Sequence, residues 1–460
     1  MTPTPAPQTL ADVLAAVPNP VDHLRDSQIG PYAFPVVRHE FTNWRDEQRS
    51  WRETCALFDQ SHHMTDLYIK GPDALRLLSD LAVNSFKNFR VNQAKQFVAV
   101  TPAGYTIGDA ILFYLDHDHF NLVGRPPAEN WVQFHATSGN YNVTVERDER
   151  SAVNQGRRRT YRFQVQGPHA QAVMEKASGH AAPDIKFFNM DAFTVAGCTV
   201  RALRHGMVGR PGWELFGPWD EAERVREAIV EAGQEFGIRQ VGARTYPTSC
   251  LESGWIPSPM PAIYTGDELL PYRRWLTSKS YEAMASLGGS FYSSNIEDYY
   301  LTPYDLGYGF FVKFDHDFVG RAALEKHAQN QKRKKVTLVW NGDDIARGYA
   351  SLSHEGEILK YIDFPLANYA TLPYDKVLKD GKIVGLSTYT GYTYNERAMI
   401  SLAMVENEYA EPGTQVTLVW GEEHCGSTKP TVERHKQLEI RATVAPAPFA
   451  EVARTAYRPK

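Results

Sequence analysis

The stretch Arg204–Pro218, with the sequence RHGMVGRPGWELFGP, decides the fold class that we predict for this chain. It leads directly into the clearest helical pattern of the sequence, Asp220–Gly237, where Asp220 can cap the start and Gly237 can end the helix. One apolar stripe runs along this helix, formed by Ala222, Val225, Ala228, Ile229 and Ala232. Strands alternate with helices in this part of the chain, so a mixed α+β architecture is expected.

Upstream of this stretch, Gly71–Asp80 predicts the start of a helix, with Pro72 where its missing N–H does no harm. Short apolar or alternating patterns predict strands at Ile111–Tyr114, His119–Val123 and Tyr161–Gln166.

Downstream, the basic run Lys332–Lys335 is interpreted as a solvated linker, after which the pattern becomes that of β-structure. Strands are expected at Val336–Trp340, Lys382–Tyr389, Ile400–Val405 and Gln415–Trp420, with turns at Asn341-Gly342 and Pro412-Gly413. We therefore divide the chain into residues 1–335 and a separate β-domain over residues 336–460.

Composition excludes several classes of protein. The 49 basic and 54 acidic residues give a net charge of -5 and are interspersed, so nucleic acid is a poor partner. The cysteines Cys55, Cys198, Cys250 and Cys425 lie far apart without a CxxC spacing, which predicts neither a metal site nor a redox pair. The sequence shows no signal peptide and no membrane-spanning run, so we expect a cytoplasmic protein with no obligate protein partner.

Familiar catalytic motifs are missing from the sequence. There is no nucleophile elbow, P-loop, HExxH or GxGxxG, so hydrolase, NTPase, metalloprotease and dinucleotide-binding functions lack their usual supports. Any chemistry must then depend on side chains that bind and orient a cofactor.

Six stretches, taken together in chain order, resemble the glycine-cleavage T-protein family of folate-dependent aminomethyltransferases. They are Leu57–Met64 (LFDQSHHM), Gly71–Leu75 (GPDAL), Gln166–Pro168 (QGP), Arg204–Pro218, Val241–Arg244 with Leu251–Gly254, and Asp317–Arg321 (DFVGR). The resemblance implies a three-lobed α+β fold with a C-terminal β-barrel around a central folate channel, and tetrahydrofolate as the cofactor.

The resemblance also implies positions for the folate. Glu214 occupies the place of the glutamate that hydrogen-bonds the pterin, and one carboxylate can accept from both the amino group and the ring N–H. Arg244 matches an arginine that could hold a substrate or folate carboxylate, although a structural ion pair explains it equally well.

Departures from the family pattern indicate a different methyl or methylene donor. Only Asp109 remains of an acidic pair that handles the aminomethyl amine, and Arg125 stands where the family has an asparagine. A cationic amine would be repelled by Arg125, whereas an anionic substrate would be held.

With His62-His63, Tyr246 and Trp255, these features resemble the tetrahydrofolate-dependent O-demethylases of lignin-derived aromatic acids, along nearly the whole chain. That resemblance implies catalytic roles for His63, Arg125 and Tyr246, on a methoxy-aromatic acid such as syringate or vanillate. It further implies substrate contacts from Tyr32, Phe34, Gln60 and His62, and cofactor contacts from Val123, Gln164, Glu214, Arg244 and Trp255. Relatives acting on vanillate carry a tyrosine in place of Phe34, so a second methoxy group gains room here and syringate is favoured.

Two other functions stay open at this point. The chain could use an aminomethyl, N-methyl or S-methyl donor, although Arg125 and the broken acidic pair argue against amines. It could also be a non-catalytic folate-binding protein, but Thr248–Gly254 lacks the glycine–tyrosine pair of those relatives.

Overall fold

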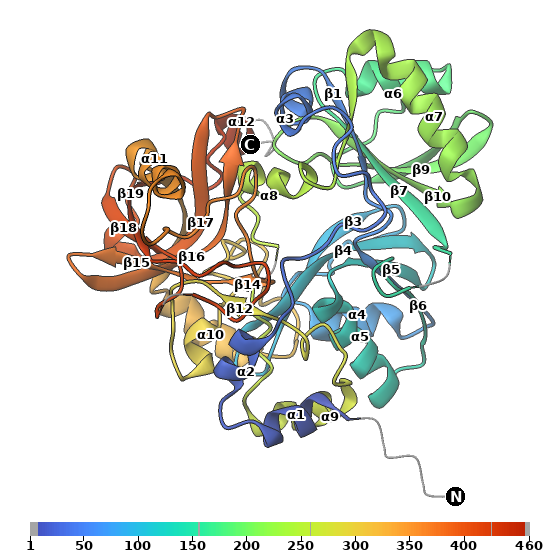
Figure 1. The fold of residues 1–460 in the computed structure, drawn as a ribbon. Helices are drawn as coiled ribbons and strands as arrows, with labels where there is room; N and C mark the ends of the chain where they lie inside the picture. Colours follow the sequence, from blue (N-terminus) through green and yellow to red (C-terminus); the bar gives the residue numbers. More distant parts are fainter. Residues whose placement is uncertain (1–7, 155–156, 258, 425, 456–460) are drawn as a thin grey trace, which may run out of the picture.

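The computed structural model describes residues 8–154, 157–257, 259–424 and 426–455, so Cys425 and the start of the Pro-rich lead lie outside the described chain. Three lobes, each built on one large sheet or barrel, surround a common centre (Figure 1). The mixed α+β fold with a C-terminal β-barrel, predicted from the sequence, is confirmed.

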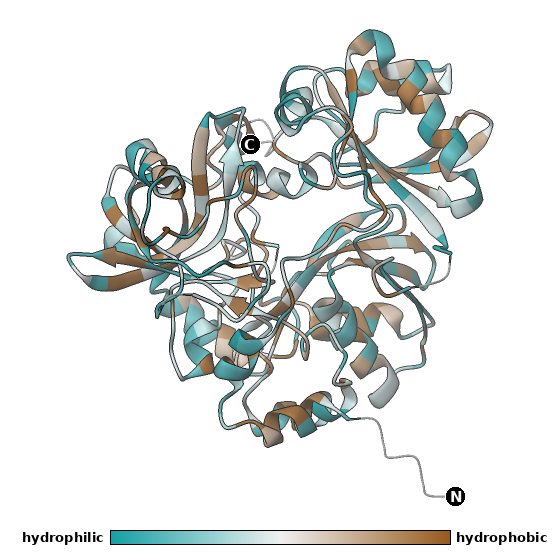
Figure 2. Ribbon diagram, viewed as in Figure 1, coloured by the Kyte–Doolittle hydropathy of each residue, from teal (hydrophilic) through white to brown (hydrophobic). Residues whose placement is uncertain are grey.

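The first lobe contains a six-stranded sheet covered on its outer face by two helices. Its strand order is β11 (Ile238–Val241), β1 (Cys55–Asp59), β7 (Thr160–Gln166), β10 (Gly212–Pro218), β9 (Cys198–Arg204) and β8 (Met190–Val195). Helices α6 (Ala170–Ser178) and α7 (Ala222–Gly233) pack on it through an apolar core that includes Phe163, Val165 and Ile229. Figure 2 shows apolar and polar residues mixed along both helices, as amphipathic helices require.

The second lobe is a five-stranded antiparallel sheet. Its order is β3 (Ala94–Val100), β4 (Thr106–Asp116), β5 (His119–Gly124), β2 (Thr65–Lys70) and β6 (Thr144–Asp148). Helices α4 (Ala74–Leu81) and α5 (Pro126–Ser138) cover one face. The other face packs toward the six-stranded sheet through Phe113, Val123 and Phe216.

The third lobe is a closed antiparallel barrel. It is formed by β13 (Arg333–Trp340), β17 (Ala398–Glu406), β16 (Lys382–Thr393), β15 (Asp375–Lys379), β18 (Gln415–Trp420) and β19 (Leu438–Ala445), with α11 (Gly342–Ala350) beside it. Its interior holds a separate apolar core that includes Leu338, Leu418 and Ile440.

The remaining α-helices and strands are not part of the two large sheets or the barrel. They are α1 (Leu10–Ala16), α2 (Pro20–Asp26), α3 (Trp44–Glu53), α8 (Ser249–Ser253), α9 (Leu270–Trp275), α10 (Arg321–Gln329), α12 (Glu451–Thr455) and the strand pair β12 (Leu287–Gly288) with β14 (Leu372–Pro373). Since β12 precedes the barrel and β14 lies within its sequence, residues on both sides of position 335 are joined by backbone pairing. The division into functional regions at that position stays a prediction.

Three local predictions were wrong. The basic run is not a linker, because Arg333–Lys335 already pair with β17 as the first residues of β13. Asp220 does not cap α7: the helix begins at Ala222, and Asp220 forms an ion pair with Arg157 instead. Asn341-Gly342 is not a hairpin turn, because the Asn341 side chain accepts hydrogen bonds from the first turn of α11.

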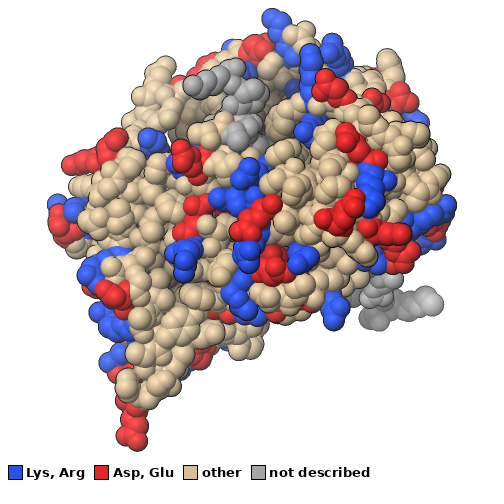
Figure 3. All heavy atoms as spheres, turned by 90° about the horizontal axis from the view of Figure 1, so that it is seen from above, with Lys and Arg blue, Asp and Glu red and all other residues tan. Residues whose placement is uncertain are grey.

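The surface carries both signs of charge. On the face shown in Figure 3, positive and negative side chains are interspersed, with no continuous basic field. None of the helices in the described ranges is both long enough and apolar enough to cross a membrane.

Candidate active site

An aromatic cluster lies where the segment before α3 meets the turn after β11. The Phe34 ring lies 4.6 Å from that of His63 and 5.0 Å from that of Tyr246, between ring centroids, and His63 and Tyr246 are 4.8 Å apart. The backbone explains this meeting: a side chain at Gly242 would come within 2.3 Å of the His39 carbonyl oxygen, so only glycine permits the close approach. The structure thus brings together three predicted residues that are distant in sequence.

The hydroxyl of Tyr246 is supported by one neighbour. Gln60 Nε2 donates to it over 3.1 Å, whereas Gln60 Oε1 is buried with no partner among the described residues. Burial raises the pKa of Tyr246 far above its ordinary value, so the phenol stays protonated. With its lone pair engaged by Gln60, the hydroxyl can donate its proton to a ligand.

The two adjacent histidines have different surroundings. His63 is buried, and its Nδ1 has no hydrogen-bond partner in the described chain. Burial, followed by the nearby charge of Arg125, lowers the pKa of His63 well below its ordinary value, so its imidazole is neutral near pH 7. The His62 ring instead contacts Ser151 Oγ (2.9 Å from Nδ1) and Asp59 (3.6 Å), outside the aromatic cluster.

Tyr32 extends the cluster toward two arginines. Its hydroxyl donates to the His63 carbonyl oxygen, and the guanidinium carbons of Arg125 and Arg150 lie 4.0 and 4.9 Å from the centre of its ring. Arg125 immediately precedes α5, where Pro126 and Pro127 fix the start of the helix. The described residues provide neither a hydrogen bond nor an ion pair for the Arg125 guanidinium.

The predicted pterin residues lie side by side on neighbouring strands. Glu214 on β10 is paired in register with Gln164 on β7, and both are buried. Arg162 Nη1 donates to Glu214 Oε1 over 2.6 Å, while Gln164 Oε1 is buried without a partner in the described chain. A side chain at Gly212 would lie 2.7 Å from Gln164 Nε2, so this glycine of the opening stretch leaves room for the amide.

Trp255 and Val123, two further predicted cofactor residues, pack in two different apolar clusters. The Trp255 indole N–H donates to Asp109 over 3.0 Å, and Tyr308 donates to the same carboxylate oxygen over 3.2 Å. Burial raises the pKa of Asp109 to about 6, although these hydrogen bonds and Arg125 oppose the shift. Val123 packs in the apolar layer between the two sheets.

Arg244 has structural partners. Its guanidinium donates to the Phe364 carbonyl oxygen over 2.6 Å and lies 3.5 Å from Glu40 and 3.9 Å from Asp363. These contacts join the segment before α3 to the barrel lobe. The ion-pair explanation is therefore the one with contacts in the structure, and a folate contact from Arg244 stays a prediction.

Sequence reasoning missed two arginines. Arg162 is enclosed between Glu214 and Asp66, and Arg150 stands over Tyr32. Arg162 carries a detectable signal, because Arg162, Gln164 and Gln166 are polar at alternate positions of a strand whose other face is apolar. Arg150 follows β6 in a stretch rich in charged residues, and nothing in the sequence distinguishes it.

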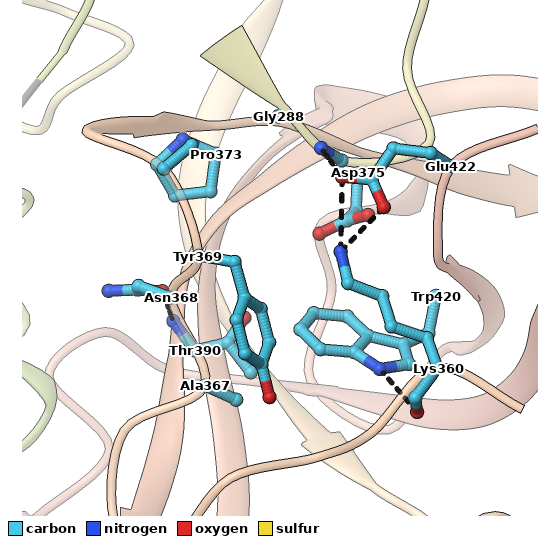
Figure 4. Close-up of a pocket in the computed structure, with 12 residues that line it drawn as sticks. Gly288, Lys360, Ala367, Asn368, Tyr369, Pro373, Asp375, Thr390, Trp420 and Glu422 are labelled. Atoms are coloured by element: carbon cyan, nitrogen blue, oxygen red, sulfur yellow. Dashed lines mark hydrogen bonds and ion pairs between the residues drawn. The ribbon is translucent and has the colours of Figure 1, made fainter. Parts of the chain in front are cut away.

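Two hollows lie elsewhere in the molecule. One, of about 10 Å³, is lined by Lys360, Asp375, Trp420 and Glu422 near the barrel (Figure 4). The other, of about 920 Å³, is lined by residues of both sheets, among them Tyr68, Lys70 and Arg201. Neither is lined by a predicted site residue. The described residues contain no group of three or more His, Cys, Asp or Glu that could hold a metal ion.

The chain belongs to the family defined by the GCVT N-terminal domain, whose profile matches residues 26–258. It is 52% identical to syringate O-demethylase of Sphingobium sp. (strain NBRC 103272 / SYK-6), covering 98% of each chain. It is 30% identical to sesamin methylene transferase of Sinomonas sp. (strain No.22), over 91% of this chain and 92% of the relative.

The fold agrees with this membership. The crystal structure of the glycine cleavage system aminomethyltransferase T from Bartonella henselae superimposes with a TM-score of 0.60 at 17% identity, covering 93% of this chain and 92% of that one. At this identity the likeness concerns the fold alone.

Proposed function

We propose that this chain is an enzyme that transfers the O-methyl group of a methoxy-aromatic acid, syringate above all, to tetrahydrofolate. The observation that carries the proposal is the full-length similarity at 52% identity to a syringate O-demethylase, combined with the convergence of Tyr246, His63 and Arg125. The products are the demethylated phenol and 5-methyl-tetrahydrofolate.

The proposed folate site fits the donors of a pterin. Glu214 and the unpartnered Gln164 Oε1 present acceptor oxygens from adjacent strands, and a pterin carries an amino group and a ring N–H side by side. Trp255 supplies an aromatic surface that Asp109 holds in place. The channel implied by the family fold would then run through the common centre of the three lobes.

When bound, tetrahydrofolate supplies the N5 nucleophile that accepts the methyl group and gives up its proton, so that the aryl ether leaves as a phenol. The residues of this chain act on the other end of the breaking bond. The Tyr246 hydroxyl donates a hydrogen bond to the leaving oxygen as negative charge develops there. The Arg125 charge favours the same oxygen, and neutral His63 positions the ring hydroxyl.

The shape of the aromatic cluster selects the substitution pattern of the substrate ring. Phe34 lies across His63 and Tyr246 and carries no hydroxyl, which leaves space for a second methoxy group on the substrate. Tyr32 and Gln60 line the same cluster, whereas His62 supports the site from behind through Ser151.

One assay tests the proposal. The purified protein is incubated with tetrahydrofolate and, in turn, syringate, vanillate and an aminomethyl donor, and 5-methyl-tetrahydrofolate is measured by chromatography. Product with syringate, less with vanillate and none with the amine is expected. Methylene-tetrahydrofolate from the amine, without methyl product from either acid, would replace the proposal by an aminomethyltransferase.

A further inference from the structure

Arg125 and Arg150 form a pair of cations without an anion. Both guanidinium groups lie against the ring of Tyr32, so their carbons are within about 9 Å of each other, the sum of the two distances to that ring. No carboxylate of the described chain comes within ion-pair distance of either group, and Arg150 Nε is buried without a hydrogen-bond partner in that part of the chain. By contrast, the buried arginines Arg158 and Arg162 both have an anionic partner in Asp66.

Such an arrangement is costly in the free protein. Like charges repel, and a half-buried guanidinium with an unused N–H loses hydration that no protein group replaces. The cation–π contacts with Tyr32 offset part of this cost, but they supply neither an anion nor a hydrogen-bond acceptor. A bound anion would balance the charge and satisfy the unused donor.

We propose that Arg150 binds the carboxylate of the aromatic substrate, while Arg125 acts at the reacting end of the same molecule. This inference rests on the proposed function. In syringate the methoxy oxygen is meta to the carboxylate, so the two groups lie on different edges of one ring, and the upper limit on the distance between the two guanidinium carbons allows one arginine to meet each group. Arg125 is given the reacting end because its guanidinium carbon lies 4.0 Å from the centre of the Tyr32 ring, and the Tyr32 hydroxyl donates to the His63 carbonyl oxygen.

The direction of the substrate follows from this assignment. Its ring lies along Tyr32, with the methoxy group toward Tyr246 and the carboxylate toward Arg150 and the loop after β6. Arg150 is then a specificity-determining residue: it selects free acids over neutral methoxyphenols, because a guanidinium and a carboxylate make charge-assisted, bidentate hydrogen bonds.

The test compares an acid with its own ester. Binding of syringate and of methyl syringate to the folate-free protein is measured by isothermal titration calorimetry, for wild type and Arg150→Gln. The variant should weaken syringate binding about 10-fold to 100-fold, the usual value of hydrogen bonds to a charged group. Binding of the ester should change less than about twofold, since the ester has no charge for Arg150 to meet.

Arg147→Gln is the matched control. Arg147 lies on the same segment but is already paired with Glu149 at 2.5 Å and Gln133 at 3.0 Å, so its loss should affect acid and ester alike. If Arg150→Gln does not fold, Arg150→Lys keeps the charge but not the bidentate geometry, and should retain part of the preference for the acid.

Several results would overturn the inference. Equal losses for acid and ester would give Arg150 a structural role, and unchanged syringate binding would remove it from the site. Weaker tetrahydrofolate binding with unchanged syringate binding would mean that Arg150 binds the glutamate carboxylate of folate and not the substrate. A wild-type protein that binds neither the acid nor the ester would instead contradict the proposed function.

Discussion

Two regions of this molecule bury charged or polar side chains, and they differ in how completely those side chains are hydrogen-bonded. Near the barrel, Lys360 Nζ contacts both oxygens of Glu422, at 3.1 and 2.9 Å, and the Gly289 N–H donates to the same carboxylate over 2.8 Å. His435 completes that cluster by accepting the Glu422 N–H (Figure 4 shows the lysine and the glutamate). In the candidate active site, by contrast, polar atoms of Gln60, His63 and Arg150 lack partners within the described chain.

This difference in hydrogen bonding indicates where a ligand binds. Buried polar groups in folded proteins are nearly always hydrogen-bonded, so a satisfied cluster needs nothing further to explain it. A cluster with several unused donors and acceptors, all facing one aromatic site, is explained by a molecule that supplies the missing partners. Burial of charge therefore does not identify the site by itself. Unpartnered polar atoms indicate a site only where several of them lie together, because single ones such as Thr337 Oγ1 and Ser387 Oγ also occur in the barrel.

The largest expected effect is on the reaction itself. Tyr246→Phe removes the hydroxyl that donates to the leaving oxygen while keeping the ring that packs on Phe34, so kcat should fall about 10³-fold. Initial rates of 5-methyl-tetrahydrofolate formation give kcat, and tetrahydrofolate binding by calorimetry should stay within about twofold of wild type. Near-normal turnover would exclude Tyr246 from the chemistry.

Substitution within the barrel cluster should lower the stability of the protein without changing its catalytic rate. Glu422→Gln leaves Lys360 buried and unpaired, which should lower the free energy of unfolding by about 3 kcal/mol. Although burial opposes it, Lys360 holds the pKa of Glu422 well below its ordinary value, so this stability is present at neutral pH and declines in acid.

Urea unfolding at pH 7 measures the loss, and kcat of the folded fraction should be unchanged. The double variant Lys360→Met, Glu422→Met is the control, because removing both charges restores part of the stability. A fall in kcat without a fall in stability would show that the two regions are not functionally separate.

Substitution in the folate half of the site should have a smaller effect, on the KM for tetrahydrofolate. Glu214→Ala removes one acceptor for the pterin and leaves Arg162 with only Asp66, so the KM for tetrahydrofolate should rise about 30-fold, roughly 2 kcal/mol. Steady-state rates at varied folate give this value. Arg162→Lys, which keeps a charge beside Glu214, should change it less, and an unaltered KM in Glu214→Ala would place the pterin elsewhere.

Much of the fold could be predicted from the sequence, because strands such as β18 and helices such as α4 and α7 carry strong local patterns. The candidate site could be predicted only through the family resemblance, since Phe34, His63 and Tyr246 meet through the approach of Gly242 to His39, which no local pattern encodes. Alternation at the end of β1 also does not reveal that His63, and not His62, faces the cluster. Arg150 could not be found at all, because its significance is the absence of a partner, which is a property of three-dimensional packing.

The smallest expected effect concerns Asp109, which accepts hydrogen bonds from Trp255 and Tyr308. Burial raises the pKa of its carboxyl from 3.8 to about 6, so its contribution to stability is full below pH 3.8 and is lost as the pH rises through 6. Asp109→Asn cannot ionise, and the stability of the variant relative to wild type should therefore increase by about 1 kcal/mol between pH 5 and pH 8. Urea unfolding of both proteins at the two pH values measures this change. Asp375→Asn provides the comparison from the barrel region, because burial raises the pKa of Asp375 to about 6 as well.

The stability of the two variants relative to wild type should change similarly with pH in the folate-free protein, but only Asp109→Asn should alter the pH dependence of syringate turnover. A stability difference that does not vary with pH would mean that Asp109 is already ionised at pH 5, and the contrast between the two regions would then rest on hydrogen bonding alone.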